Sequence, residues 1–149
     1  MLAAVALFGV LNIRSELAGG VPPTGTAPGQ STAGAIESFA LAHGASVGYG
    51  GYWDSAPVMW ETHLRVRLYP IDACGTPQGW CPFGGIQINT WYTPRPHTRT
   101  FLLTDSRGGI PLEVPSPPAS FGHPIAGESL GGGLTLYIYD HDIAGNLGS

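Results

Sequence analysis

Residues 46–69 of the chain read SVGYGGYWDSAPVMWETHLRVRLY, and this stretch decides the fold. It opens with a short run, 46–50, that predicts a strand leading into two aromatic residues. Asp54 or Ser55 then suits the N-cap of a short helix, because either side chain can accept bonds from unpaired N–H groups of the first turn. Residues 64–69 alternate apolar side chains with arginine, which predicts a half-buried strand with both arginines facing solvent.

The segments on either side extend this pattern. Ser31 or Thr32 can cap a helix that runs to about His43, and Gly44 suits the left-handed position after a helix. Further strands and a final helical turn are predicted at 99–104, 134–139 and 142–147. The order of elements predicts an α/β fold, a small sandwich of about four to five strands in a mixed sheet with two or three short helices. Residues 86–92 are either β-like or a loop carrying aromatics, and 110–133 follow no clear pattern.

The N-terminal part differs from the rest in composition. Residues 1–13 form one apolar run without a charge, and 18–30 are rich in glycine and proline. A spanning helix needs about 20 apolar residues, so the run is too short to cross a membrane alone. We interpret 1–17 as an apolar helix forming part of a membrane anchor, 18–30 as a linker, and 31–149 as an extracytoplasmic α/β domain. A buried N-terminal helix is the alternative interpretation of the apolar run.

The charge pattern excludes one class of partner. Charged residues make up 11% of the chain, the net charge is −4, and lysine is absent. The six arginines are scattered along the sequence. A nucleic-acid-binding protein needs a clustered basic face to neutralise phosphates. We therefore expect no nucleic-acid partner.

Two cysteines, Cys74 and Cys81, frame a short loop that contains proline and glycine. No second pair of ligands lies at zinc-site spacing. Such a loop closes easily, so we predict a disulfide, with two free structural thiols as the alternative. A disulfide would place the domain in an oxidising compartment outside the cytoplasm. The run Asp140-His141-Asp142 offers possible metal ligands, but neighbouring side chains on a strand diverge, and we predict no metal site.

Aromatic residues near the ends of predicted strands are the main candidate for a binding site. Ligands of open α/β sheets bind outside the carboxyl ends of the strands. Aromatic faces with a few polar partners suit a sugar ring. The candidate binding residues are Tyr52, Trp53, Asp54, Asn89, Trp91, Tyr92 and Arg95. The alternative is that the aromatic residues form the core and a membrane-facing surface.

Three stretches resemble the C-terminal extracytoplasmic domain of bacterial polytopic membrane glycosyltransferases of the GT-C class. They contain AHG at 42–44 with GYGGYWD at 48–54, CPF at 81–83 with NTWYTPR at 89–95 and TFLLTD at 100–105, and LTLYIY at 134–139 with DIA at 142–144. The resemblance covers about 36–147. It implies a large helical membrane body that takes sugar from a polyprenyl-phosphate donor. The essential acidic residue of that family lies in an early extracytoplasmic loop, which has no counterpart here.

The resemblance therefore implies a non-catalytic accessory domain, held at the cell membrane on its extracytoplasmic side by the N-terminal helix. Its role would be to help an acceptor or a lipid-linked sugar reach the enzyme, and it requires no cofactor. The alternative function is a free-standing exported module that binds carbohydrate or cell-wall polymer.

Overall fold

The computed structural model describes residues 30–75, 79–85, 88–109 and 112–148. Its helices are α2 (Thr32–Ala42) and α3 (Tyr52–Glu61). Its strands are β1 (Val47–Gly50), β2 (Arg67–Ala73), β3 (Trp80–Pro82), β4 (Thr100–Asp105), β5 (Ala126–Gly131) and β6 (Leu134–Tyr139). Three short 3-10 turns complete the described elements: η1 (Asn89–Tyr92), η2 (Ala119–Phe121) and η3 (Ile143–Asn146).

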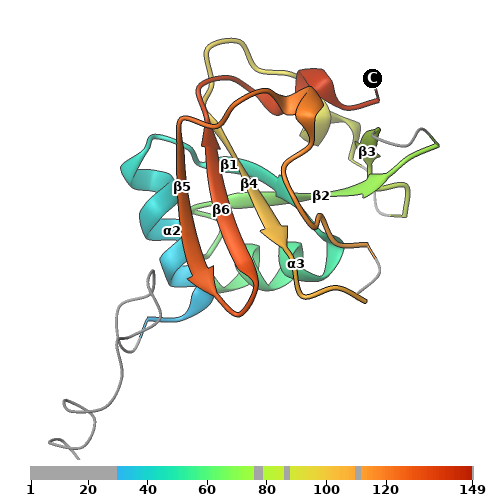
Figure 1. Cartoon of the computed structure of the whole chain (residues 1–149). Helices are drawn as coiled ribbons and strands as arrows, with labels where there is room; N and C mark the ends of the chain where they lie inside the picture. Colours follow the sequence, from blue (N-terminus) through green and yellow to red (C-terminus); the bar gives the residue numbers. More distant parts are fainter. Residues whose placement is uncertain (1–29, 76–78, 86–87, 110–111, 149) are drawn as a thin grey trace, which may run out of the picture.

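All six strands form one mixed sheet in the order β3-β2-β1-β4-β6-β5 (Figure 1). β1 pairs in parallel with both β2 and β4, and the remaining neighbours are antiparallel. The predicted α/β class with a mixed sheet is confirmed, with slightly more strands than expected. The chain passes from β1 through α3 to β2 on one side and returns to β4 on the other. The carboxyl end of β1 is therefore a topological switch point, where open α/β sheets commonly bind ligands.

The two helices cover one face of the sheet (Figure 1). Between helices and sheet lies an apolar core that includes Ile36, Ala40, Val58, Leu68, Phe101, Leu103, Leu136 and Ile138. Loops and 3-10 turns cover the opposite face, over a second core that includes Tyr49, Tyr69, Ile71, Leu102, Phe121, Tyr139 and Ile143. Neither helix of the described residues is long and apolar enough to span a membrane. The expected anchor helix at 1–17 and the linker residues 18–29 lie outside the described residues.

The first predicted helix is confirmed at both ends. Ser31 is the N-cap of α2, and its hydroxyl accepts a hydrogen bond from the amide of Gly34 at 3.1 Å. His43 is the C-cap, and Gly44 follows with φ of 73°. Glycine adopts this left-handed conformation without the steric cost that a Cβ atom brings.

The predicted helix cap at Asp54 or Ser55 is wrong. α3 begins earlier, and its N-cap is Gly51, which has no side chain to accept a bond. Asp54 lies in the first turn, where the positive end of the helix dipole stabilises a negative charge. The Ser55 hydroxyl instead donates back to the carbonyl of Gly51 at 2.8 Å.

The strand predicted at 64–69 starts too early. β2 begins only at Arg67, because the chain first turns through His63 and Leu64, which have φ of 50° and 62°. The alternation of apolar residues with arginine thus spans a turn and a strand, and Leu64 is exposed. Of the two interpretations of 86–92, the aromatic loop is correct for the described part, where residues 89–92 form η1. The unpatterned segment 110–133 contains β5.

The predicted disulfide is confirmed. The sulfurs of Cys74 and Cys81 lie 1.98 Å apart, with 5.7 Å between the Cα atoms. The bond ties the end of β2 to β3, which pairs antiparallel with it. The C-terminal segment lies against the same strand, since the amide of Gly148 donates to the carbonyl of Trp80 at 2.7 Å.

Candidate functional site

The structure brings three of the seven predicted binding residues into one groove. Tyr52, Trp53 and Trp91 line a groove of about 430 Å³. Its other lining residues are Ser55, Ala56, Pro57, Met59 and Pro70. Tyr52 and Trp53 come from α3, just after the carboxyl end of β1, whereas Trp91 comes from η1. We call this surface the aromatic groove.

The aromatic groove lies beside an edge of β2, which contributes Pro70 to its lining. β3 pairs with only the last three residues of β2, so within the described residues Arg67–Tyr69 has a strand partner on one side alone. Pro70 fits this edge because it has no N–H group to leave unpaired. α3 packs beside β2 from one face of the sheet, and Trp91 packs onto the other face. Their side chains meet over the edge.

Packing fixes the orientation of the aromatic rings. Trp91 stacks on Tyr69 with 4.8 Å between ring centroids and 10° between planes. Tyr52 contacts Phe83 at 4.7 Å and Trp53 edge-to-face at 5.0 Å. Trp53 remains 55% exposed, so much of its ring is accessible to a ligand.

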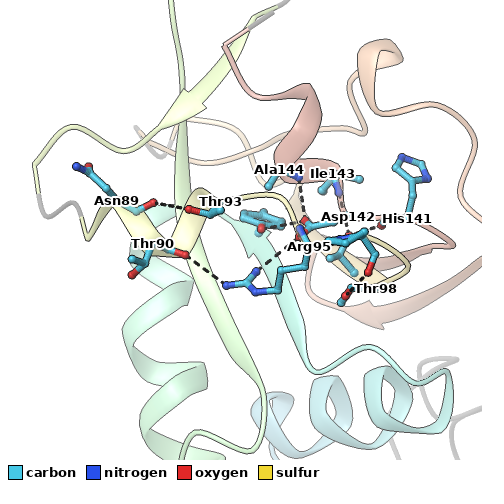
Figure 2. Close-up of polar contacts among 12 residues, drawn as sticks. Asn89, Thr90, Thr93, Arg95, Thr98, His141, Asp142, Ile143 and Ala144 are labelled. Atoms are coloured by element: carbon cyan, nitrogen blue, oxygen red, sulfur yellow. Dashed lines mark hydrogen bonds and ion pairs between the residues drawn. The ribbon is translucent and has the colours of Figure 1, made fainter.

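Two other predicted residues do not line the aromatic groove. Tyr92 has a structural role: its hydroxyl donates to the carbonyl of Pro70 at 2.6 Å, and burial raises its pKa to about 12. Asn89 is exposed, and its carbonyl accepts a hydrogen bond from the hydroxyl of Thr93 at 3.5 Å (Figure 2). Neither residue is among those that line the groove.

Arg95 lies beside the aromatic groove, in an adjoining pocket that also contains Thr90 and Trp91. Its main-chain amide donates to Asp142 Oδ2 at 2.9 Å, and its Nη1 lies 3.6 Å from the same oxygen (Figure 2). Asp142 also caps η3, accepting a hydrogen bond from the amide of Ala144 at 3.0 Å. The final helical turn predicted at 142–147 is thus confirmed, and its cap anchors the segment that carries Arg95.

Asp54 points away from the aromatic groove into a group of three carboxyl groups. Oxygen atoms of Asp54, Asp105 and Glu113 all lie within 4.8 Å of one another. Asp105 ends β4, next to the carboxyl end of β1, and Glu113 reaches Gly51 from the following loop. A Cβ atom on Gly51 would lie 1.6 Å from Glu113 Oε2, so a larger residue there would force the Glu113 carboxyl group to move. We call these three residues the carboxylate cluster.

Protons and one arginine balance the charge of the carboxylate cluster. Burial, reinforced by the negative charge of Asp54, raises the pKa of Glu113 to about 8, and burial also raises the pKa of Asp54. Arg107 holds the pKa of Asp105 below its usual value, donating from Nε to both carboxylate oxygens at 2.9 and 2.8 Å. Asp54 Oδ2 and both oxygens of Glu113 are enclosed without an ordinary hydrogen-bond donor. A proton on Glu113 therefore lets the two carboxyl groups lie together at neutral pH.

Carboxylate oxygens are the donors that hard divalent cations prefer, so these three residues could in principle hold a cation. Here the guanidinium of Arg107 supplies the positive charge. Main-chain hydrogen bonds beside the carboxylate cluster join the loop at 112–114 to α3 and β4. The amide of Tyr52 donates to the carbonyl of Leu112 at 3.0 Å, and the amide of Asp105 donates to the carbonyl of Val114 at 2.8 Å. A proton held between Glu113 and Asp54 would add a further link between the loop at 112–114 and α3.

Sequence reasoning missed Asp105 and Glu113 as partners of Asp54. Asp105 and Glu113 lie 51 and 59 positions after Asp54 along the chain, and no short motif links them to it. The parallel pairing of β1 with β4, which places Asp54 and Asp105 near one edge of the sheet, was not predicted from the sequence.

Comparison of the chain with protein-family models, with curated proteins and with solved structures finds no match.

Proposed function

We propose that this chain is a carbohydrate-binding, extracytoplasmic accessory domain of a membrane glycosyltransferase. The observation that carries the proposal is the aromatic groove itself, in which Tyr52, Trp53 and Trp91 converge from two distant segments. The accessory role rests on the resemblance of 36–147 to such domains. On this proposal the domain presents a sugar, either on an acceptor or on a lipid carrier, to a catalytic site elsewhere.

The form of the aromatic groove suits a sugar ring. The less polar face of a pyranose carries C–H bonds, which pack on aromatic faces, while its hydroxyl groups stay in water or bond to the rim. Packing already orients Trp91, so binding costs little conformational entropy there. Thr90 and Arg95 lie close by and can meet ring hydroxyls.

The disulfide supports the proposed location. Cytosolic proteins rarely keep structural disulfides, because glutathione and thioredoxin reduce their thiols. The bond between Cys74 and Cys81 favours an exported domain. Both the membrane-anchored domain and a free-standing exported module would lie in such an oxidising compartment. The carbohydrate site is the same in both.

The proposal is tested by titrating the full chain with methyl glycosides of D-glucose, D-galactose, D-mannose and N-acetyl-D-glucosamine while recording tryptophan fluorescence. At least one glycoside should bind, and Trp53→Ala and Trp91→Ala should each weaken it about tenfold or more. Trp60→Ala is the matched control, because Trp60 is 83% exposed and lies outside the groove. The proposal is wrong if no glycoside binds, or if Trp60→Ala weakens binding as much as the two groove variants do.

The two settings are separated by purifying the native protein from membranes. An accessory domain should copurify with, or be part of, a polytopic glycosyltransferase. A free-standing module should be recovered without one and should bind insoluble cell-wall polymer directly.

A further inference from the structure

A second pocket adjoins the aromatic groove and contains two arginines. It encloses about 450 Å³, and its lining residues are Met59, Leu64, Arg67, Tyr69, Thr90, Trp91 and Arg95. Met59 and Trp91 also line the aromatic groove, so the two spaces share these side chains as walls. No acidic residue is among the residues that line this pocket. We call it the arginine pocket.

Arg67 brings an uncompensated charge to the arginine pocket. It is the first residue of β2, its side chain is exposed, and within the described residues it forms no ion pair. Side chains two residues apart on a strand point to the same face, so Arg67 lies on the same side of β2 as Tyr69. The ring of Tyr69 stacks on Trp91. The free guanidinium therefore lies on the sheet face that carries one wall of the aromatic groove.

Arg95 supplies the second guanidinium, and its existing contacts leave donors unused. Its Nη1 is enclosed, lies 3.6 Å from Asp142 Oδ2, and has no hydrogen bond to any described residue. Its Nη2 reaches the carbonyl of Thr90 only at 3.5 Å (Figure 2). Asp142 already accepts from the hydroxyl of Tyr49 at 3.1 Å. A guanidinium offers five N–H donors in a planar fork, so Arg95 retains capacity for a ligand.

The charge balance decides the class of ligand. Two guanidinium groups face the arginine pocket, and the carboxylate of Asp142 offsets one of them. One positive charge remains beside a groove suited to a sugar ring. Guanidinium groups bind carboxylates and phosphates through paired, charge-assisted hydrogen bonds.

We propose that the arginine pocket binds an anionic substituent, a phosphate ester or a carboxylate, of the carbohydrate held in the aromatic groove. The domain would thus be selective for acidic saccharides. This inference rests on the proposed function for the identity of the carbohydrate, but the anion site itself is independent of it.

The first test uses inorganic phosphate with the full chain, followed by ¹H–¹⁵N NMR. Phosphate should shift the amide signals of Arg67, Thr90 and Arg95, and Arg67→Gln should abolish the shifts. Arg99→Gln is the matched control, because it removes the same charge from an exposed arginine whose Nη1 contacts the carbonyl of His43 instead. The inference is overturned if phosphate produces no localised shifts, or the same shifts in Arg67→Gln.

The second test compares methyl D-glucoside, D-glucose 1-phosphate and D-glucuronate. At least one of the two acidic sugars should bind about tenfold more tightly than the neutral glucoside, and Arg67→Gln should remove that preference. The stronger of the two identifies phosphate or carboxylate as the anion. Equal affinity of all three sugars would reject the inference.

The outcomes separate this inference from the proposed function. Loss of glycoside binding in Trp53→Ala, without any effect of Arg67→Gln, would reject the arginine pocket and leave the aromatic groove standing. Phosphate shifts that depend on Arg67, without binding of any sugar, would reject the carbohydrate proposal and leave an anion site.

Discussion

Replacing Glu113 with glutamine should change how stability depends on pH. The pKa of Glu113 is raised from 4.5 to about 8, because burial and the charge of Asp54 disfavour its ionised form. In the unfolded chain the group ionises near its ordinary pKa. The folded state therefore binds more protons than the unfolded state across this interval. The contribution of Glu113 to the free energy of unfolding should be greatest below a pH of about 4.5 and should fall as the pH rises through about 8.

The size of this effect follows from the pKa shift and the exposure of the site. At about 1.4 kcal/mol per pH unit, the full shift would correspond to an upper limit of about 5 kcal/mol. Asp54 and Glu113 are only half-buried, and solvent screening reduces the interaction. We expect the free energy of unfolding contributed by Glu113 to fall by about 1–2 kcal/mol between pH 4.5 and pH 8.

Urea unfolding of the wild-type chain and of Glu113→Gln at several pH values measures the effect. The glutamine is uncharged throughout, so the variant should lose most of the decline seen in the wild type. Glu128→Gln on β5 is the matched control, and it should keep the wild-type dependence. Identical pH dependence in wild type and Glu113→Gln, or a stability of the wild type relative to Glu113→Gln that increases with pH over this interval, would refute the account of the carboxylate cluster.

Three further predictions concern the framework of the groove. Gly48→Ala should lower the free energy of unfolding by about 1–3 kcal/mol, because the new Cβ would lie 2.3 Å from the buried ring of Phe101. Replacing Cys74 and Cys81 together with serine should lower it by about 2–3 kcal/mol, since the unfolded chain gains the freedom of an open loop. Tyr92→Phe should lower it by about 1 kcal/mol through loss of one hydrogen bond, and should leave glycoside affinity within about twofold. Urea denaturation measures all three changes.

The controls for these variants come from the same chain. Gly145→Ala should leave stability unchanged, because no atom lies within 4 Å of the position that its new Cβ would occupy. The serine double variant should match the wild type once the latter is measured in reductant. A loss in Gly145→Ala equal to that in Gly48→Ala, or a reductant effect on the serine variant, would contradict these explanations.

Much of the fold could be predicted from the sequence, because local patterns determine it. The cap at Ser31, the glycine at 44 and the apolar alternation at 134–139 each specify an element without help from the rest of the chain. The start of β2 could not be predicted. The alternating residues before it continue the strand pattern, while the backbone turns through His63 and Leu64. Alternation alone cannot distinguish a turn that exposes Leu64 from a strand that buries it.

The candidate site was predictable only in part. Aromatic composition pointed to Tyr52, Trp53 and Trp91, and the structure places them together. Composition could not separate them from Tyr92, whose role is a buried hydrogen bond to the β2 edge. Nor could it predict that Arg67 and Arg95 line one pocket, since this arrangement depends on how η1 packs beside β2.

The most direct test of the central claim is a ¹H–¹⁵N NMR titration that follows the indole N–H signals of the four tryptophans. The ligand is whichever of the methyl glycosides of D-glucose, D-galactose, D-mannose and N-acetyl-D-glucosamine binds most tightly. Trp53 and Trp91 line the aromatic groove, whereas Trp60 and Trp80 do not. We predict that the glycoside shifts the signals of Trp53 and Trp91 with one shared dissociation constant and leaves the other two in place. Shifts confined to Trp60 or Trp80, or no shift in any of the four, would contradict the assignment of the aromatic groove as a carbohydrate site.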